Sequence, residues 1–172
     1  MSSEVPRARL ASVSPAEFRH ACGRFATGVT IASALDDRGI AHGLTVSSFT
    51  SVSLEPPLIL ICLGHEATMI DVFRRAFHFG ISILREGDHA LSQRFATPGQ
   101  DRFEGVAWRR GQTGVPLIDC ALAALECKVH QRFTAGDHDL LVGCVVSTRV
   151  EDGAPLIHYA GRYRRLVSDG GG

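Results

Sequence analysis

The sequence predicts a mainly β protein, built as a small antiparallel barrel with a few peripheral helices. Six or more short segments rich in β-forming residues follow one another at hairpin spacing, and few stretches have a helical pattern. The chain of 172 residues has the length of one domain. It contains neither G-x-G-x-x-G nor G-x-x-x-x-G-K-[ST], so a nucleotide would not sit in a Rossmann or P-loop cradle.

The first expected element is a helix with a well-defined start. Ser14 is suited to the N-cap, Pro15 to the first helical position, and Glu17 to a capping box with Ser14. The helix should end before Gly28. Four residues spaced for one helical face would form its apolar side, namely Phe18, Ala21, Cys22 and Phe25.

The rest of the pattern is mostly that of strands separated by turns. Turns are expected at 36–39 and 134–137, and an irregular surface excursion at 97–114. Strands are expected at 29–35, 40–49, 58–63, 77–84, 126–133, 138–150, 154–160 and 162–167. Phe77, Phe79, Ile81 and Ile83 alternate and should share one face. Two further short helices are expected at 68–75, with Thr68 as a candidate N-cap, and at 88–95.

We expect a single domain over residues 1–172, with a core at about 14–167 and flexible tails at 1–13 and 168–172. The longest purely apolar run, 58–63, is far too short to cross a bilayer, and the N-terminus has no apolar region like that of a signal peptide. The five cysteines form no C-x-x-C pair, and four lie in apolar or strand-like runs. These features predict a cytoplasmic protein with reduced, buried thiols.

The charge composition argues against several classes of partner. With 18 basic and 18 acidic residues the net charge is zero, so no basic footprint indicates nucleic acid. The eight histidines show no metal-ligand spacing with one another or with cysteine. No nucleophile elbow supports a Ser–His–Asp triad. Trp108 is expected in the core or at an interface.

A cluster of hydroxyl groups is the strongest sign of a ligand site. Six of the nine residues from 45 to 53 carry a hydroxyl, namely Thr45, Ser47, Ser48, Thr50, Ser51 and Ser53. They alternate with β-formers and precede the apolar strand 58–63, which favours an ordered strand–turn–strand over a disordered loop. Ordered hydroxyls and backbone N–H groups suit the polar edge of a planar heterocycle or a phosphate. A small-ligand site and a plain hairpin both remain open on this pattern.

The wording of this stretch, HGLTVSSFTSVSLEPPLILICL at 42–63, resembles the signature of the short-chain flavin reductases. Further blocks resemble that family in the family's order, at 25–30, 91–96, 102–108, 125–129, 136–138 and 161–164. The resemblance covers roughly residues 16–166. It implies an FMN-binding split β-barrel and an NAD(P)H:flavin oxidoreductase that supplies reduced flavin to a separate two-component monooxygenase. It also implies a homodimer with the flavin near the interface.

The resemblance also assigns roles to individual residues. Four would line the isoalloxazine ring with backbone and hydroxyl groups, namely Thr45, Val46, Ser47 and Ser48. Ser51 and Ser53 would approach the ribityl phosphate, although Ser53 is equally suited to outward-facing strand polarity. His138 would face the nicotinamide and orient it. The alternative is that His138 only caps the turn.

Two more groups of candidates come from the predicted elements. Leu63, Gly64 and Thr68 lie where a strand end leads into a helix N-terminus, which offers free N–H groups to an anion. The second group follows the strand at 77–84 and comprises Leu84, Arg85, His89, Ser92, Arg94 and Phe95. An arginine there can pair with a phosphate, while a solvated helix face is the alternative for each polar member.

The function expected is hydride transfer from NADH or NADPH to FMN, with FAD as a second acceptable flavin. The sequence leaves the choice between FMN and FAD open, because the implied split barrel leaves the adenylate end near solvent. It also leaves the choice between NADH and NADPH open, because no acidic residue stands at a Rossmann spacing. Two rival functions share the fold class. One is a ferric or metal-chelate reductase that uses flavin as an electron relay, and the other is a non-catalytic flavin- or haem-binding protein.

Overall fold

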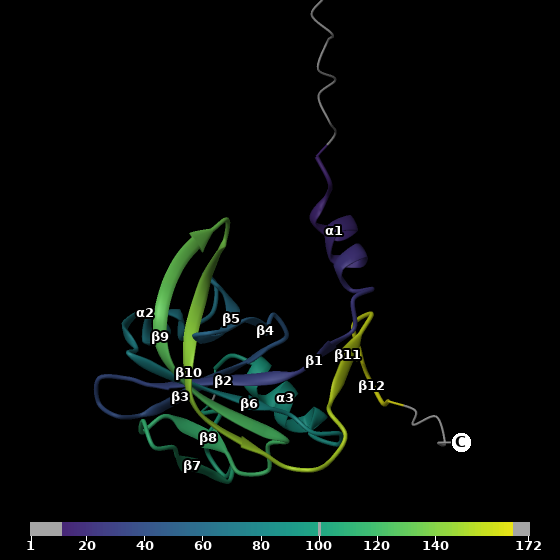
Figure 1. Ribbon diagram of the computed structural model, residues 1–172. Helices are drawn as coiled ribbons and strands as arrows, with labels where there is room; N and C mark the ends of the chain where they lie inside the picture. The colour runs from purple at the N-terminus through teal and green to yellow at the C-terminus, as the bar shows by residue number, and fades with distance from the viewer. Residues whose placement is uncertain (1–11, 100, 167–172) are drawn as a thin grey trace, which may run out of the picture.

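A strongly curved, seven-stranded antiparallel sheet forms the centre of the molecule (Figure 1). The structure, a computed structural model, describes residues 12–99 and 101–166. In spatial order the strands are β3 (Ala41–Val46), β2 (Thr30–Leu35), β6 (His78–Ile83), β9 (Ala123–Ala135), β10 (His138–Val150), β5 (Pro57–Gly64) and β4 (Thr50–Leu54). The predicted mainly β architecture is confirmed. The predicted flexible tails lie outside the described residues, apart from residues 12 and 13.

Strand β2 is buried on both faces, which explains its uninterrupted run of small and apolar residues. Ala32 faces a core cluster that includes Phe73 of α2 (Ile70–Arg75). Ile31 faces a second cluster that includes Phe95 of α3 (His89–Ala96). The sheet is therefore packed on its inner side by α2 and on its outer side by α3.

The longest hairpin joins β9 to β10 through Gly136 and Asp137, as the sequence predicted with a slightly wider turn. Gly136 has a φ of 61°, which a residue without a side chain adopts at little cost. Residues 130–138 are largely exposed, and the end of the hairpin projects from the body of the molecule (Figure 1). Its first β10 residue, His138, pairs with the last residue of β5, Gly64.

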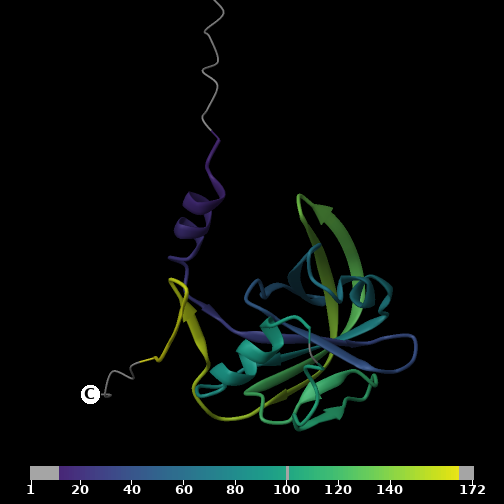
Figure 2. The same cartoon turned by 180° about the vertical axis from the view of Figure 1, so that it is seen from behind.

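A second, three-stranded sheet carries the N-terminal helix. It consists of β1 (Thr27–Gly28), β11 (Ile157–Tyr159) and β12 (Arg162–Arg164). Helix α1 (Pro15–Cys22) has the predicted capping box between Ser14 and Glu17. None of its residues is buried, and Phe18 and Phe25 are 62% and 77% exposed. Figures 1 and 2 show this helix standing away from the large sheet, so its predicted apolar face has no partner within the described chain.

Three details of the predicted elements are wrong. Thr68 is not the N-cap of α2, because the helix begins at Ile70 after Met69, and no side chain caps it. Phe77 is 83% exposed and does not share the buried face of Phe79, because β6 begins only at His78. The second strand ends at Val46 instead of residue 49, and a three-residue link at 47–49 leads to β4.

The irregular excursion contains part of a small two-stranded sheet, β7 (Trp108–Arg110) with β8 (Pro116–Ile118). Trp108 is half-buried and meets Phe103 edge to face, with ring centroids 5.5 Å apart. This contact places the tryptophan against the second core cluster.

All five cysteines are free, but the expectation that they are buried holds only in part. Cys127 is buried, which raises the pKa of its thiol to about 12, whereas Cys22 and Cys120 are exposed. Within the described ranges, no group of three or more His, Cys, Asp or Glu side chains is arranged to hold a metal ion. No helix in that part of the chain is long and apolar enough to cross a membrane.

Candidate functional site

The hydroxyl-rich segment joins the two edge strands of the large sheet. β3 and β4 lie at opposite ends of the strand order, and residues 47–49 connect them across the open side of the curved sheet. An edge strand leaves one row of its backbone N–H and C=O groups without ladder partners. The segment thus combines unpaired backbone groups with clustered hydroxyls.

The hydroxyls of this segment are of two kinds. Ser48 is an anchor, because its Oγ accepts a hydrogen bond from Cys62 N at 2.8 Å and donates one to Cys62 O at 3.1 Å. Ser53 donates to the carbonyl of Pro56 and so fixes the β4–β5 turn. Ser47 and Ser51 are exposed, and their hydroxyls make no hydrogen bond to the described residues. These two remain available to a ligand.

Helix α3 covers the outer side of β3. Thr45 Oγ1 donates to Ser92 O at 2.6 Å, and Tyr163 Oη donates to Ser92 Oγ at 2.9 Å. A methyl group at Gly43 would lie only 2.9 Å from the ring of Phe95, so glycine is needed there for the helix to approach the strand. The hydroxyl of Thr45 is therefore committed to the α3 backbone, and Thr45 shapes the site more than it offers a free group.

Five of the predicted contact residues lie in the interior of the chain. Their exposed fractions are 5% or less, for Val46, Leu63, Leu84, Ser92 and Phe95. Residues buried to this degree have almost no surface to offer a ligand. In this structure they pack beneath the surface of the site, and their predicted contacts with a ligand stay predictions.

The two candidate arginines differ in what they contact. The guanidinium of Arg94 donates to the carbonyls of Asp101, Arg102 and Glu104 and so fixes the loop after α3. The guanidinium of Arg85 has one long contact, from Nη2 to Ala121 O at 3.5 Å, and its buried Nε has no partner. Arg85 Nη1 makes no hydrogen bond to the described residues, so Arg85 is the one of the two that retains a donor for an anion.

His89 is the exposed histidine of α3. It lines a surface cavity of about 430 Å³ together with Gly87, Leu156, Tyr163 and Arg164. Its ring centroid is 6.3 Å from that of Tyr163. The cavity lies between the α3 start and β12, and Thr68, which is exposed in the turn before α2, does not line it.

The end of the β9–β10 hairpin places His138 beside Gly64. His138 Nδ1 is 2.7 Å from Asp137 Oδ1, and a methyl group at Gly64 would lie 3.5 Å from His138 Nε2. The hydrogen bond from His138 lowers the pKa of Asp137 below its usual value. An ionised carboxylate only accepts hydrogen bonds, so His138 carries its proton on Nδ1 and presents Nε2 as an acceptor when the ring is neutral.

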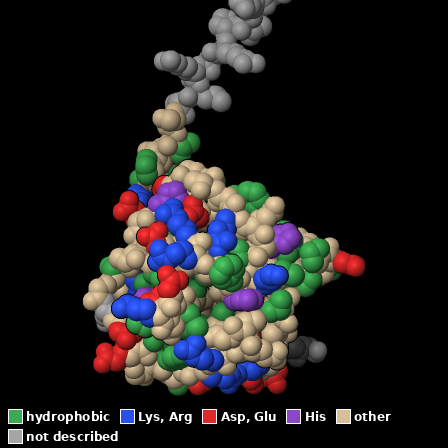
Figure 3. Space-filling model, turned by 90° about the vertical axis from the view of Figure 1, so that its left-hand side faces the viewer, with side chains coloured by type: hydrophobic (Ala, Val, Ile, Leu, Met, Phe, Trp, Pro, Cys, Tyr) green, Lys and Arg blue, Asp and Glu red, His purple; other side chains and the backbone are tan. Residues whose placement is uncertain are grey.

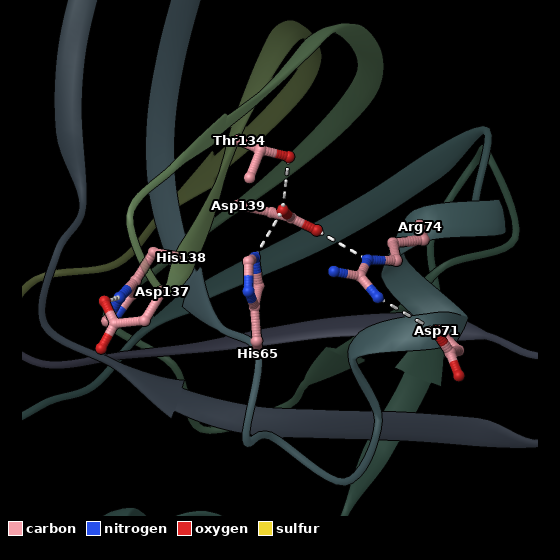
Figure 4. A network of polar contacts seen from close by, with 7 residues as sticks. All are labelled: His65, Asp71, Arg74, Thr134, Asp137, His138 and Asp139. Carbon is pink, nitrogen blue, oxygen red and sulfur yellow. Dashed lines mark hydrogen bonds and ion pairs between the residues drawn. The ribbon is translucent and has the colours of Figure 1, made fainter.

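Sequence reasoning missed a second polar cluster at the same hairpin end. Asp139 lies between His65 and Arg74, which belong to the loop after β5 and to α2 (Figure 4). The Arg74 guanidinium and then the His65 ring hold the pKa of the Asp139 carboxyl well below its usual range. His65 and Arg74 lie 74 and 65 positions from Asp139 in the chain, so no local sequence pattern joins them to it.

The face that carries α2 shows no broad region of one charge. Figure 3 shows basic, acidic and histidine side chains interspersed there among apolar ones. This distribution matches the zero net charge. A polyanion such as nucleic acid would find no extended basic surface on that face.

Comparisons with known proteins identify relatives over nearly the whole chain. Residues 22–167 match the family described as flavin reductase like domain. The chain is 42% identical over 160 residues to the NADH-dependent flavin reductase of Rhodococcus sp. This alignment covers 90% of this chain and 88% of that protein. The chain is also 41% identical over 152 residues to the reductase component of 4-nitrophenol 4-monooxygenase/4-nitrocatechol 2-monooxygenase of Rhodococcus opacus, covering 88% and 81%.

A solved structure gives the same result at the level of the fold. The NADH:FAD oxidoreductase of Streptomyces globisporus C-1027, in complex with NAD and FAD fragments, aligns with a TM-score of 0.87 and 35% sequence identity. The alignment covers 94% of this chain and 99% of that chain.

Proposed function

The chain belongs to the flavin reductase like domain family, and on this basis we propose that it passes a hydride from NADH to a flavin and releases the reduced flavin to a separate monooxygenase. Flavin reductase activity with a nicotinamide nucleotide, as the sequence predicted, agrees with the names of its relatives. The preference for NADH and the identity of the flavin are the finer parts of the proposal.

The observation that carries the proposal is that two polar regions lie near the end of β5, one on its β4 side and one on its β10 side. Ser48 bonds to the backbone of Cys62, and Gly64, two residues further along the same strand, pairs with His138. Two strand residues span about 7 Å. The link at 47–49 and the imidazole of His138 thus lie near the same end of β5, as two stacked substrates require, whereas Ser51 pairs with Ile59 further along the strand.

The residues present fit a planar flavin. The unpaired backbone groups of the edge strands and the hydroxyls of Ser47 and Ser51 would bind the polar rim of the ring. Arg85, whose Nη1 has no partner among the described residues, is a candidate for the phosphate. A bound flavin supplies the electron acceptor, and the nicotinamide C4 supplies the hydride. His138 would hold the nicotinamide carboxamide or ribose through Nε2, and it need not exchange a proton with either ring.

We propose FMN as the preferred flavin, with FAD also accepted. Of the two arginines predicted for the site, Arg85 alone retains a free donor, which serves one phosphate-sized group. FAD is the alternative, because one relative is named an NADH-dependent FAD reductase. Titration of the apoprotein with FMN, FAD and riboflavin compares them directly.

We further propose that the protein works as a homodimer in the cytoplasm. Phe18 and Phe25 of the α1 region are exposed, and so are Val52 and Leu54 on the free edge strand β4. Apolar surface of this kind is usually covered by a partner. The free thiols of Cys22 and Cys120 favour a reducing compartment. Light scattering tests the assembly, and a monomer that binds and reduces flavin at working concentrations would contradict it.

Steady-state kinetics with each flavin and each nicotinamide nucleotide test the activity itself. The expected result is rapid oxidation of NADH that depends on added FMN or FAD, with slower turnover of NADPH. Absence of flavin-dependent NADH oxidation with all combinations would remove the proposal. Iron-chelate reduction that outruns flavin release would instead favour the ferric reductase alternative.

A further inference from the structure

The carboxylate of Asp139 joins three separate elements at the projecting end of the hairpin (Figure 4). Its Oδ1 accepts hydrogen bonds from His65 Nε2 at 2.8 Å and Thr134 Oγ1 at 3.1 Å. Its Oδ2 accepts one from Arg74 Nε at 2.7 Å. The Asp139 side chain is 14% exposed, whereas the neighbouring Asp137 side chain is 92% exposed. Asp139 is thus the fixed carboxylate of this region.

This arrangement sets the protonation of His65. Because the Asp139 carboxylate is ionised and can only accept, His65 Nε2 must carry a proton. In the neutral ring the other nitrogen, Nδ1, is then an acceptor. Figure 4 shows that nitrogen on the side of the ring toward Asp137 and His138. Arg74 already balances the carboxylate charge, so a neutral His65 suffices for the contact.

His65 and His138 flank the same residue, Gly64. His65 follows it in the chain, and its backbone N donates to Asp137 O at 2.9 Å, while His138 is the cross-strand neighbour of Gly64. Each imidazole is held by its own aspartate and presents one acceptor nitrogen when neutral. A methyl group at Gly64 would be in ordinary van der Waals contact with the His138 ring, 3.5 Å from Nε2, so this ring lies directly against Gly64.

We propose that His65, oriented by Asp139, is a second histidine that positions the nicotinamide nucleotide. Its Nδ1 accepts a hydrogen bond from a carboxamide N–H or ribose O–H of the nucleotide, while His138 contacts the same nucleotide from the other side of Gly64. Asp139 acts through His65 and is a positioning residue. The inference rests on the proposed function, which places the nicotinamide at this end of β5.

A matched set of variants tests the assignment. His65→Gln keeps an amide N–H for Asp139 but has no acceptor at the place of Nδ1. It should raise the KM for NADH by about three- to tenfold, the effect of one lost hydrogen bond, with the FMN dissociation constant unchanged. Asp139→Asn should change the KM in the same direction. The double variant should be no worse than the worse single one, because the two residues act as a unit.

Thr134→Val is the control, since it removes only the third hydrogen bond to Asp139. It should keep the wild-type KM for NADH. If His65→Gln lowers the melting temperature and leaves the KM unchanged, the cluster only docks α2 onto the hairpin and the inference is overturned. A loss of FMN affinity in place of NADH affinity would overturn it as well.

Nitrogen NMR of the imidazoles gives a readout that does not depend on turnover. His65 should show the Nε2–H form in the wild type and lose this preference in Asp139→Asn. Addition of NAD⁺ should shift the His65 Nδ1 resonance; a resonance insensitive to NAD⁺ would contradict a direct contact. If hydride transfer is slow in His138→Ala but the kinetics of His65→Gln are normal, this inference alone is overturned. If the wild-type protein cannot reduce flavin, the proposed function is overturned.

Discussion

The β3–β4 edge and the end of the β9–β10 hairpin are both polar, yet they use their polar groups in opposite ways. At the edge, the hydroxyls of Ser47 and Ser51 make no hydrogen bond to the described residues, and one row of backbone groups has no ladder partner. At the hairpin end, Asp139 is bonded to three side chains. Free groups recognise a ligand, whereas mutually satisfied groups fix the orientation of the few that remain free. The two regions should therefore respond differently to substitution.

His138→Ala should have the largest effect, because it removes the exposed imidazole that the hairpin presents. We expect hydride transfer to slow, or the KM for NADH to rise, by on the order of tenfold to a hundredfold, with FMN affinity nearly intact. Stopped-flow reduction beside a thermal melt measures both properties. A variant that melts earlier but reduces flavin at the wild-type rate would show that His138 only caps the turn.

Arg85→Met tests the flavin side of the comparison. It removes the guanidinium whose Nη1 has no partner among the described residues, so FMN affinity should fall about tenfold or more, the effect of a charge-assisted contact. Riboflavin affinity should not change, because riboflavin has no phosphate. Ser53→Ala is the contrast: its hydroxyl holds the β4–β5 turn, so we expect it to weaken both flavins alike. Equal losses for both flavins in Arg85→Met would assign Arg85 to the fold.

Ser51→Ala should have a smaller effect of the same kind. Loss of one neutral hydrogen bond predicts about a two- to tenfold weaker flavin dissociation constant and an unchanged KM for NADH. Thr50→Val is the matched control on the same strand, since the Thr50 hydroxyl donates to Ser51 O. If the Thr50 variant is as impaired as the Ser51 variant, the edge is sensitive to its conformation and not to a free hydroxyl.

The smallest effect concerns acid stability and the hairpin end. The folded-state pKa of Asp139 lies below its ordinary value of 3.8, so its contribution is fully present above about that pH. It is lost as the pH falls through the folded-state value. Asp139→Asn should therefore be less stable than the wild type at neutral pH, and the gap should close below about pH 4. Chemical denaturation across this range measures it, and a gap independent of pH would show that the carboxylate charge is not involved.

Local patterns predicted most of the fold. The capping box at Ser14, the turn at Asp36–Gly39 and the long hairpin depend on neighbouring residues, and all three occur. The hydroxyl cluster could also be identified from the sequence, because its members are close in the chain. The sequence could not predict which of these hydroxyls are free, because the hydrogen-bond partners of Thr45 and Ser48 lie on α3 and β5, far away in the chain. The Asp139 cluster depends on contacts between residues up to 74 positions apart, which no local pattern encodes.

The most direct test of the account is anaerobic stopped-flow mixing of the protein and FMN with NADH. We predict that the absorbance of oxidised flavin is lost at a rate that saturates with NADH. His138→Ala should change that saturation, and Ser51→Ala should change only the dependence on flavin concentration. Flavin reduction no faster than in buffer, or variants of the two regions that alter the same parameter, would contradict a hydride transfer between a flavin at the β3–β4 edge and a nicotinamide at the hairpin end.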